Sequence, residues 1–307
     1  MPGTDLVVPE VVLGMMRIWH KSDAEIAALV DAALSSGINF FDHAGIYGGE
    51  LGIHGCEKRF AKALNYSAEA RSNMILQTKA GIDTNGPFFD FSYDHIVNSV
   101  NESLAALRTD YIDILLLHRP DALVEPEEVA RAFDELEAAG KVRYFGVSNQ
   151  QPGQIELLKT AVKQPLIANQ LQLSITHANV FAQPMAINMN GLPQSISRDN
   201  EVVDYCRLHN MTLQAWSPFQ AGFFDGPFIG NEKYPELNAV LNRMAAEKGV
   251  TPDAVAVAWI LRHPAHWQVV VGTTQPGRVR DAGDGADIEL TRPEWYELFR
   301  AAGHTVP

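Results

Sequence analysis

The sequence predicts an α/β fold in which eight parallel strands alternate with helices, a (β/α)8 TIM barrel with long loops at its C-terminal face. Eight apolar strand signals are separated by helical signals, an alternation typical of βα units and a parallel sheet. The 307 residues, divided among eight units, give about 38 residues a unit, which matches a barrel of ~250 residues with insertions. A doubly wound sheet is the alternative, but no Gly-x-Gly-x-x-Gly segment follows the first strand.

Short apolar runs predict the strands, because strands buried on both faces have this composition. They are expected at residues 11–15, 39–42, 74–79, 112–118, 142–148, 167–171, 212–216 and 267–271. Apolar residues near a 3.6-residue period, and Pro or Gly at the ends, predict the helices. They are expected at residues 23–36, 56–64, 93–107, 126–140, 152–162, 200–208, 235–248, 252–262, 276–282 and 292–302.

The first helix carries clear end signals. Ser22, with Glu25 three residues later, is typical of a capping box that begins a helix. Gly37 stands where a helix commonly ends in a left-handed residue.

The alternation is interrupted twice, at residues 174–200 and 217–234, which contain several Pro and Gly residues. Loops of this length inside a compact domain are usually functional or disordered. No linker-like composition divides the chain, so we expect residues 1–307 to form a single domain.

The composition excludes several classes of function. A net charge of −13 argues against nonspecific nucleic-acid binding, which needs a basic face. No apolar run reaches the roughly 18 residues needed to cross a membrane, and the N-terminus does not resemble a signal peptide. The two cysteines, Cys56 and Cys206, make no disulfide framework, which fits a reducing compartment. A cytoplasmic protein is therefore expected.

Four polar residues fall at or just after the ends of predicted strands. Asp42 closes the second strand, Tyr47 follows on its loop, Lys79 ends the third strand and His118 ends the fourth. Taken singly, each has an ordinary explanation as a turn cap, a packed ring or a solvated charge. All four at the edge where barrel enzymes carry their chemistry predict a catalytic site.

The chemistry of these groups fits carbonyl reduction. Tyrosine is a weak acid with an ordinary pKa of about 10, which a cation such as Lys79 would lower. Asp42 can hold Lys79 charged, and His118 can hydrogen-bond a substrate oxygen. No residue can donate hydride, so a nicotinamide cofactor is implied. The histidines and cysteines show no metal-binding spacing. His43, beside Asp42, is either a partner of this cluster or a plain loop residue.

At this point the sequence resembles the aldo-keto reductases over nearly its whole length. Residues 42–48, DHAGIYG, are similar to the family signature D-x-A-x-x-Y-G, and Lys79 and His118 match the other two members of its catalytic tetrad. Residues 140–149, GKVRYFGVSN, are similar to a second family segment. The run HRPD at residues 118–121 and the Trp-Ser pair at 216–217 resemble the bacterial YdhF-type oxidoreductase branch.

The resemblance implies NADPH bound in extended form at the C-terminal face. Ser148, Asn149 and Gln170 would hold its carboxamide, and Trp216 would stack on its nicotinamide. Without the resemblance, Ser148 and Asn149 would suggest only a turn and Trp216 core packing. Further cofactor contacts are expected from Gly14, Met15, Asp42 and Ser217.

The adenine end shows two departures from the family. Gly272, Thr273 and Thr274, followed by Arg278, match the segment that holds the 2′-phosphate and adenine. Many members carry lysine at the position of Gly272 and asparagine at that of Ala282. Arg278 still offers planar recognition of a phosphate, so NADPH is expected, with NADH as the alternative.

The substrate mouth is expected to be apolar and aromatic, and to accept an aldehyde or ketone with little charge. We expect it to involve the 174–197 loop and the side chains of Met15, Met16, Trp19, Tyr47, Phe88, Phe89, His118 and Trp216.

Two other functions use the same residues. A Schiff-base aldolase would use Lys79 as nucleophile but would leave Ser148, Asn149 and Arg278 without a role. A regulatory subunit would keep the cofactor site and act by docking to a partner.

Overall fold

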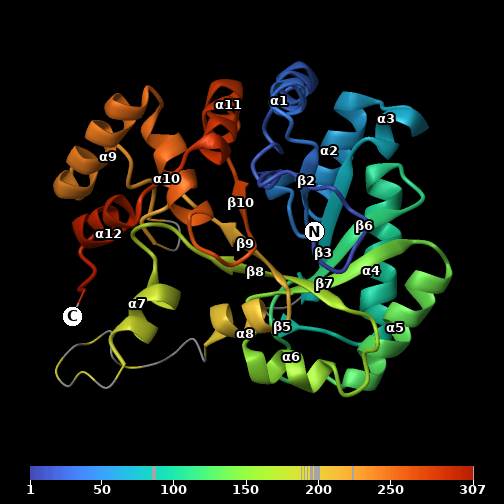
Figure 1. The fold of residues 1–307 in the computed structure, drawn as a ribbon. Helices are drawn as coiled ribbons and strands as arrows, with labels where there is room; N and C mark the ends of the chain where they lie inside the picture. Colours follow the sequence, from blue (N-terminus) through green and yellow to red (C-terminus); the bar gives the residue numbers. More distant parts are fainter. Residues whose placement is uncertain are drawn as a thin grey trace.

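A computed structural model describes residues 1–84, 88–187, 189, 191, 193, 196, 201–222 and 225–306, and it confirms the predicted barrel. Eight parallel strands close in the order β1-β10-β9-β8-β7-β6-β3-β2. Figure 1 shows the helices arranged around these strands. The strands are β1 Val11–Gly14, β2 Phe40–Asp42, β3 Ile75–Ala80, β6 Ile112–Leu117, β7 Val142–Ser148, β8 Leu166–Gln172, β9 Thr212–Trp216 and β10 Trp267–Val271.

The described helices, all but two of which match predicted ones, follow the strands along the chain. They are α1 Asp23–Ser35, α2 Gly55–Leu64, α3 Ala68–Ser72, α4 Tyr93–Leu107, α5 Pro126–Ala138, α6 Pro152–Leu158, α7 Asn179–Met185, α8 Val202–Leu208, α9 Pro235–Lys248, α10 Pro252–Leu261, α11 Pro276–Asp284 and α12 Arg292–Ala301, with short 3-10 turns η1 Gly49–Leu51 and η3 Gly285–Asp287. The bounds of α4, β7, α9, β9 and β10 match the predictions residue for residue.

Both ends of helix α1 have the structure that the sequence predicts. Ser22 accepts a hydrogen bond from the backbone of Glu25, whose carboxylate in turn accepts from the backbone of Ser22. Gly37 has a φ of +73°, in the left-handed region that glycine adopts without strain.

Several elements were not predicted. Helix α3 and an antiparallel pair, β4 Ile82–Asp83 with β5 Phe88–Phe89, lie in segments expected to be loops. Helix α7 interrupts the stretch 174–200, so the expectation of an irregular segment is wrong there. Helix α8 begins at Val202, and the predicted start at residue 200 lies outside the described residues. These pieces are short, and tertiary packing rather than a long periodic pattern stabilises such pieces.

Two layers of apolar side chains hold the barrel together. One lies between strands and helices; the other gathers alternate strand residues, including Val12, Phe40 and Ile114. Met1 and Val8 pack against this second cluster, so the N-terminal segment covers one end of the barrel. Each fully buried large apolar side chain contributes about 1.5–3 kcal/mol, so this packing fixes where the strand ends lie.

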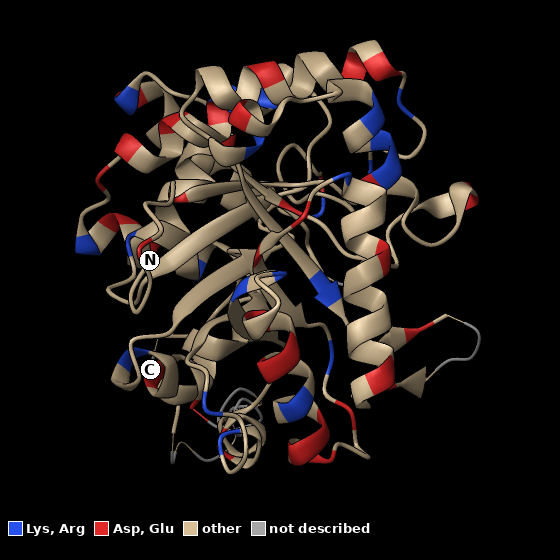
Figure 2. Ribbon diagram, turned by 90° about the vertical axis from the view of Figure 1, so that its right-hand side faces the viewer, with Lys and Arg blue, Asp and Glu red and all other residues tan. Residues whose placement is uncertain are grey.

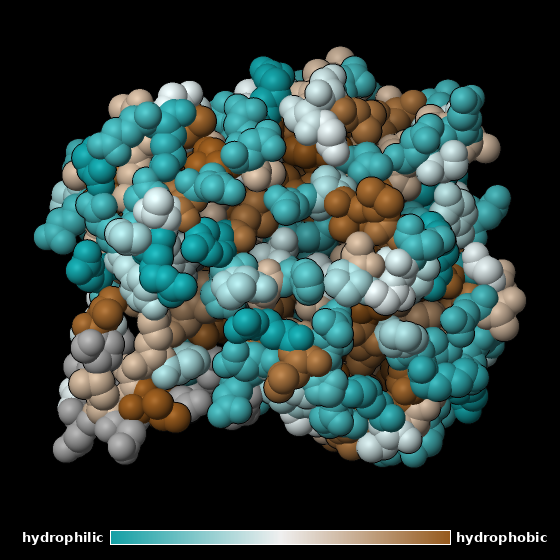
Figure 3. Space-filling model, viewed as in Figure 1, coloured by the Kyte–Doolittle hydropathy of each residue, from teal (hydrophilic) through white to brown (hydrophobic). Residues whose placement is uncertain are grey.

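The outer surface is polar. Figure 2 shows acidic and basic residues mainly on the helices and loops, and Figure 3 shows hydrophobic residues in small patches among hydrophilic ones. In the described part of the chain, no helix has the length and apolar character needed to cross a membrane.

Candidate active site

Four polar side chains meet at one edge of the barrel. Asp42 is the last residue of β2, Lys79 lies near the end of β3 and His118 directly follows β6. These strands are neighbours in the barrel, so their carboxyl ends share an edge. Tyr47 joins them from the loop after β2. The four residues that the sequence predicts as a cluster are therefore brought together.

The ammonium group of Lys79 lies at the centre of this cluster. Its Nζ donates to both carboxylate oxygens of Asp42, at 2.6 and 2.7 Å, and to the phenol oxygen of Tyr47 at 3.4 Å. Lys79 and Asp42 are only 3% and 2% exposed. Removing one partner of a buried ion pair costs about 3–5 kcal/mol, because the other charge is left unpaired.

The protonation states follow from burial and from this pair. Burial alone would lower the pKa of Lys79 and is the largest single effect, but the charges and hydrogen bonds of Asp42 and Tyr47 together outweigh burial and raise that pKa above its ordinary value. Burial raises the pKa of Tyr47, and the opposing effect of Lys79 is smaller. The expected net lowering of the tyrosine pKa is therefore wrong, because the phenol is removed from water. Tyr47 carries its proton at neutral pH, and Lys79 is a cation.

His118 is a neutral ring beside the phenol. Burial, with the charges of Lys79 and Arg119, holds the pKa of His118 well below its ordinary range. Its ring centroid lies 5.9 Å from that of Tyr47, at an interplanar angle of 84°. A neutral imidazole can donate or accept a hydrogen bond at this place.

A row of buried glutamines holds Asp42 from below. Gln77 and Gln170 donate to Oδ1 of Asp42, at 2.6 and 3.2 Å. Both also donate to Gln214, at 2.9 and 3.1 Å, and Gln214 donates to Gln268 at 3.0 Å. These amides fix the carboxylate in one orientation. Gln77, Gln214 and Gln268 were missed because single polar residues inside apolar strands give no spacing signal.

The loop that carries Tyr47 is held by a buried ion pair. Nδ1 of His54 lies 2.5 Å from Glu57, which also accepts from the hydroxyl of Thr78 at 2.7 Å. A side chain at Gly48 would collide with the backbone of the same loop, so the turn after Tyr47 requires glycine. The loop is thereby fixed to β3, beside Lys79.

The ring of His43 makes no hydrogen bond to the polar cluster. The ring is fully buried, packs on Phe60 with centroids 4.8 Å apart, and neither nitrogen has a hydrogen-bond partner among the described residues. Burial lowers its pKa to about 4, so the ring is neutral. Only its backbone oxygen contacts Lys79, at 2.9 Å. No group of three or more His, Cys, Asp or Glu residues in the described ranges could hold a metal ion.

A cavity of about 400 Å³ opens over these residues, and we call it the catalytic cavity. Most predicted site residues line it: Gly14, Met16, Asp42, Tyr47, His118, Ser148, Asn149, Gln170, Trp216, Ser217, Gly272, Thr273 and Arg278. Lining residues that were not predicted as contacts are Arg17, Ile46, Ile82, Arg119, Pro218, Phe219, Gln220, Pro227 and Val270. Most of these lie in loops, where no periodicity indicates which side chains converge.

Five predicted contacts do not line the catalytic cavity with their side chains. Met15 is fully buried, and the ring of Trp19 lies against Gly49. Phe88 and Phe89 are 51% and 42% exposed on β5. None of these four residues is among those that line the catalytic cavity, but Phe89 lines a neighbouring cavity, so their contacts with substrate or cofactor stay predictions. The fifth is Thr274, which follows the lining residues 272–273. The 174–197 loop lies partly outside the described residues.

The residues expected at the nicotinamide end form a connected group. Asn149 donates to Ser148 at 2.8 Å, and the indole of Trp216 donates to Asn149 at 3.2 Å. Gln170 also lines the catalytic cavity, and the side-chain hydrogen bonds described for it use its amide nitrogen, so its amide oxygen is left as an acceptor. A carboxamide needs such an acceptor, so the donor and acceptor set fits this group.

The residues expected at the adenine end offer one cation. Arg278 lines the catalytic cavity, donates to Asp253 and lies over Phe219, 5.4 Å from its centroid. A Cβ at Gly272 would contact nothing within 4 Å, so there is room beside the backbone here. The guanidinium of Arg278 could therefore contact a phosphate in the catalytic cavity while it keeps its ion pair with Asp253.

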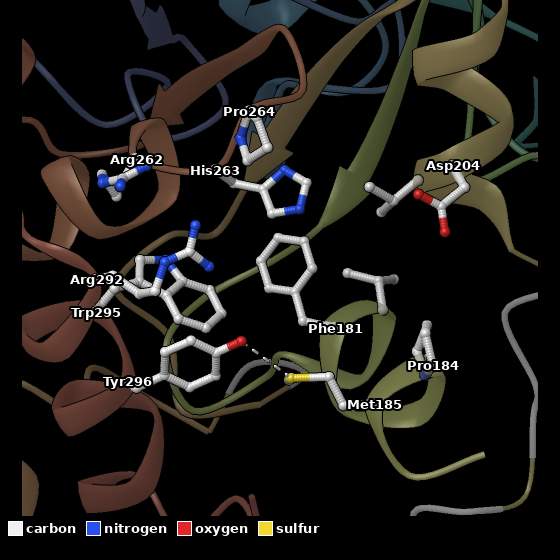
Figure 4. A pocket seen from close by; sticks show the side chains of 12 residues that line it. Phe181, Pro184, Met185, Asp204, Arg262, His263, Pro264, Arg292, Trp295 and Tyr296 are labelled. Carbon is white, nitrogen blue, oxygen red and sulfur yellow. Dashed lines mark hydrogen bonds between the residues drawn. The ribbon is translucent and has the colours of Figure 1, made fainter. Parts of the chain in front are cut away.

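A second cavity, of about 390 Å³, lies away from this site, between α7, α8 and α12. Figure 4 shows Phe181, Trp295 and Tyr296 along it, with Arg262 and Arg292 nearby. It contains none of the predicted site residues. The clustered donors and acceptors of the catalytic cavity make that cavity the candidate active site.

Comparison with known proteins gives full-length matches. The model of the Aldo/keto reductase family matches residues 10–301. Uncharacterized oxidoreductase YcsN of Bacillus subtilis is 35% identical, over 99% of this chain and 97% of that protein. The 6-dehydroglucose reductase of Agrobacterium fabrum is 33% identical, over 97% and 95% of the two chains. Oxidoreductase YdhF of Escherichia coli is 31% identical, over 96% and 94%.

A solved structure agrees in fold. The aldo-keto reductase of Klebsiella pneumoniae in complex with NADPH superposes with a TM-score of 0.74, at 22% identity, over 95% of this chain and 90% of that chain.

Proposed function

The chain belongs to the aldo/keto reductase family, and on this premise we propose that it reduces aldehydes or ketones to alcohols with NADPH. Members of the family use nicotinamide cofactors. The observation that carries the proposal is the position of Tyr47, which keeps its proton beside the buried Lys79–Asp42 pair on the wall of the catalytic cavity.

Each catalytic group has one task in this proposal. Bound NADPH would supply the hydride that reduces the carbonyl carbon. Tyr47 donates its proton to the carbonyl oxygen, and the Lys79 cation stabilises the phenolate left behind. Asp42 keeps Lys79 protonated and in place. His118 can hydrogen-bond the same oxygen without adding another positive charge.

The cofactor would lie along the residues that converge on the catalytic cavity. Ser148, Asn149 and Gln170 offer the polar groups that a carboxamide needs, and Trp216 offers a ring for stacking. Arg278 provides the charge for a 2′-phosphate, which favours NADPH over NADH. Gly14, Met15 through its backbone, Asp42, Ser217, Gly272, Thr273 and Thr274 are proposed as further contacts.

The raised pKa of Lys79 argues against the aldolase. A Schiff-base nucleophile must lose its proton, whereas the pKa of Lys79 is raised, so the aldolase is disfavoured.

The cysteines bear on the location of the protein. Cys56 and Cys206 are free and buried, which fits the cytoplasm that we propose as the site of action.

The proposal is tested by a panel of aldehydes and ketones assayed separately with NADPH and NADH. We expect turnover without any partner protein and a higher kcat/KM with NADPH. Tight binding of NADPH with no turnover on the panel would favour the regulatory subunit instead.

A further inference from the structure

Arg119 stands on a wall shared by two cavities. It follows His118 directly and lines the catalytic cavity. A neighbouring open cavity of about 770 Å³ is lined by the same Arg119, together with Asn149 and Trp216. A molecule whose carbonyl lies at Tyr47 could therefore reach the guanidinium and extend into the neighbouring cavity.

Among the described residues, Arg119 has no counter-charge. Across the described ranges, no carboxylate lies within ion-pair distance of its guanidinium, and its one described interaction is with the ring of Trp216, 5.7 Å from the centroid. The closest acid in sequence, Asp121, accepts from two backbone amides instead. By contrast, the buried Arg71 is paired with Asp113 at 2.8 Å.

A half-buried arginine without a counter-charge destabilises the folded protein, unless a bound anion compensates for the water that its charge has lost. Burial lowers the pKa of Arg119, which reflects the loss of water around its charge. A guanidinium keeps its charge even so, and its planar donors match a carboxylate in a two-point contact. A bound anion would restore the missing partner.

The rest of the neighbouring cavity suits an uncharged body. Its apolar lining comes from Phe89, Pro120, Leu171, Val180 and Val202, with amides between them. Among the described residues of that lining, Arg119 is the only lysine or arginine, so one anionic group has one place to bind there.

We propose that Arg119 binds a carboxylate on the substrate, and that the preferred substrates are therefore aldehydes or ketones that carry a carboxylate. This rests on the proposed reductase function and replaces the expectation of a substrate with little charge. Arg119 is then a specificity-determining residue that acts on the part of the substrate remote from the reacting carbon.

The test compares charged and neutral aldehydes of the same shape. The three positional isomers of carboxybenzaldehyde, which vary the distance between the two groups, are assayed beside their methyl esters with NADPH. For at least one isomer, Arg119→Gln should lower kcat/KM of the acid about 10- to 100-fold, the value of a charge-assisted hydrogen bond. The ester should change less than about 3-fold. Arg119→Lys should recover part of the loss, since it keeps the charge without the planar donors.

Controls separate the explanations. Arg300→Gln removes an exposed charge from α12, outside both cavities, and should leave both substrates unchanged. An equal loss for acid and ester would overturn the proposal and assign Arg119 to the reacting oxygen or the cofactor. No acid preference for any isomer in the unchanged protein would also overturn it.

A binding measurement keeps the inference distinct from the reductase proposal. If no aldehyde is reduced, the proposed function fails, but the three hydroxymethylbenzoates and their methyl esters can still be titrated calorimetrically into the protein with NADP+. Binding of an acid that Arg119→Gln weakens about 10-fold or more supports the anion site. Equal affinity for each acid and its methyl ester would overturn the proposed anion site.

Discussion

At the scale of single residues, the proposed chemistry depends on the phenol proton of Tyr47. Tyr47→Phe removes this proton and little volume. Because general acid catalysis typically contributes about 10²- to 10⁴-fold, we expect a loss of that size in kcat, with the Kd of NADPH nearly unchanged. Steady-state kinetics and fluorescence titration measure the two effects. Tyr205→Phe, on the outer helix α8, is the matched control and should keep full activity. Normal turnover by Tyr47→Phe would refute the assignment.

Variants of the Lys79–Asp42 pair test whether reduction requires the positive charge of Lys79. Lys79→Met should abolish reduction, but it also leaves Asp42 buried and unpaired, at a cost of about 3–5 kcal/mol in the free energy of unfolding. The double variant Lys79→Met with Asp42→Asn should regain much of that stability and remain inactive. Asp42→Asn alone should impair reduction less than Lys79→Met, because the lysine remains, but burial should then lower the pKa of Lys79 and reduce the fraction of cation.

The outcome that contradicts this view is equally specific. A borohydride-trapped adduct between Lys79 and a substrate, together with carbon–carbon cleavage, would establish the aldolase. Recovery of activity in the double variant would show that the loss in Lys79→Met was a folding defect.

We propose that Arg278 sets the preference of the protein for NADPH over NADH. Arg278→Ala should weaken NADPH about 10- to 100-fold, because a charge-assisted hydrogen bond to the 2′-phosphate is lost, and NADH hardly at all. Asp253→Asn is the control, since it breaks the ion pair to Arg278 but leaves the guanidinium. It should not weaken NADPH. Equal weakening of both cofactors by Arg278→Ala would indicate a structural role.

At the scale of elements, the join between the Tyr47 loop, α2 and β3 is sensitive to pH through His54. Burial lowers the pKa of His54, but Glu57 and Glu102 more than compensate and raise it above the ordinary 6.5. Protonated His54 therefore stabilises the folded state fully below pH 6.5, and this contribution is lost as the pH rises through the raised folded pKa.

The measurement compares the thermal midpoint of the protein with that of His54→Asn, from pH 5.5 to 9. Asparagine tolerates the left-handed backbone at this position, where φ is +60°, and does not titrate. The thermal midpoint of the unchanged protein should exceed that of the variant most near pH 5.5, and this difference should shrink towards pH 9. A constant difference would mean that His54 carries the same charge in the folded and unfolded states.

At the scale of the whole molecule, we propose that residues 1–307 form one domain. The barrel closes by pairing β1 with β10, for example Val12 with Val270, so residues from the two ends of the chain share one sheet. Scanning calorimetry should give a single endotherm, with matching calorimetric and van't Hoff enthalpies. Val12→Ala, which removes buried methyl groups, should lower the whole transition. Two separated endotherms would contradict the proposal.

The sequence by itself determined the order of the eight barrel strands and of most helices, and it grouped the four residues that we propose as catalytic. Apolar runs and end signals such as Ser22 and Gly37 act within a few residues, so they are readable along the chain. Asp42, Lys79 and His118 could be grouped because parallel strands in a barrel bring their carboxyl ends to one edge.

Only the tertiary structure decided what those groups experience. It raised rather than lowered the pKa of Tyr47, because burial depends on every element around the phenol. It placed the ring of Trp19 against Gly49, joined Gln77 to Gln214 across the barrel, and left Arg119 with no carboxylate partner among the described residues. Such contacts join residues far apart in sequence, whose separation follows no period, so no local pattern indicates them.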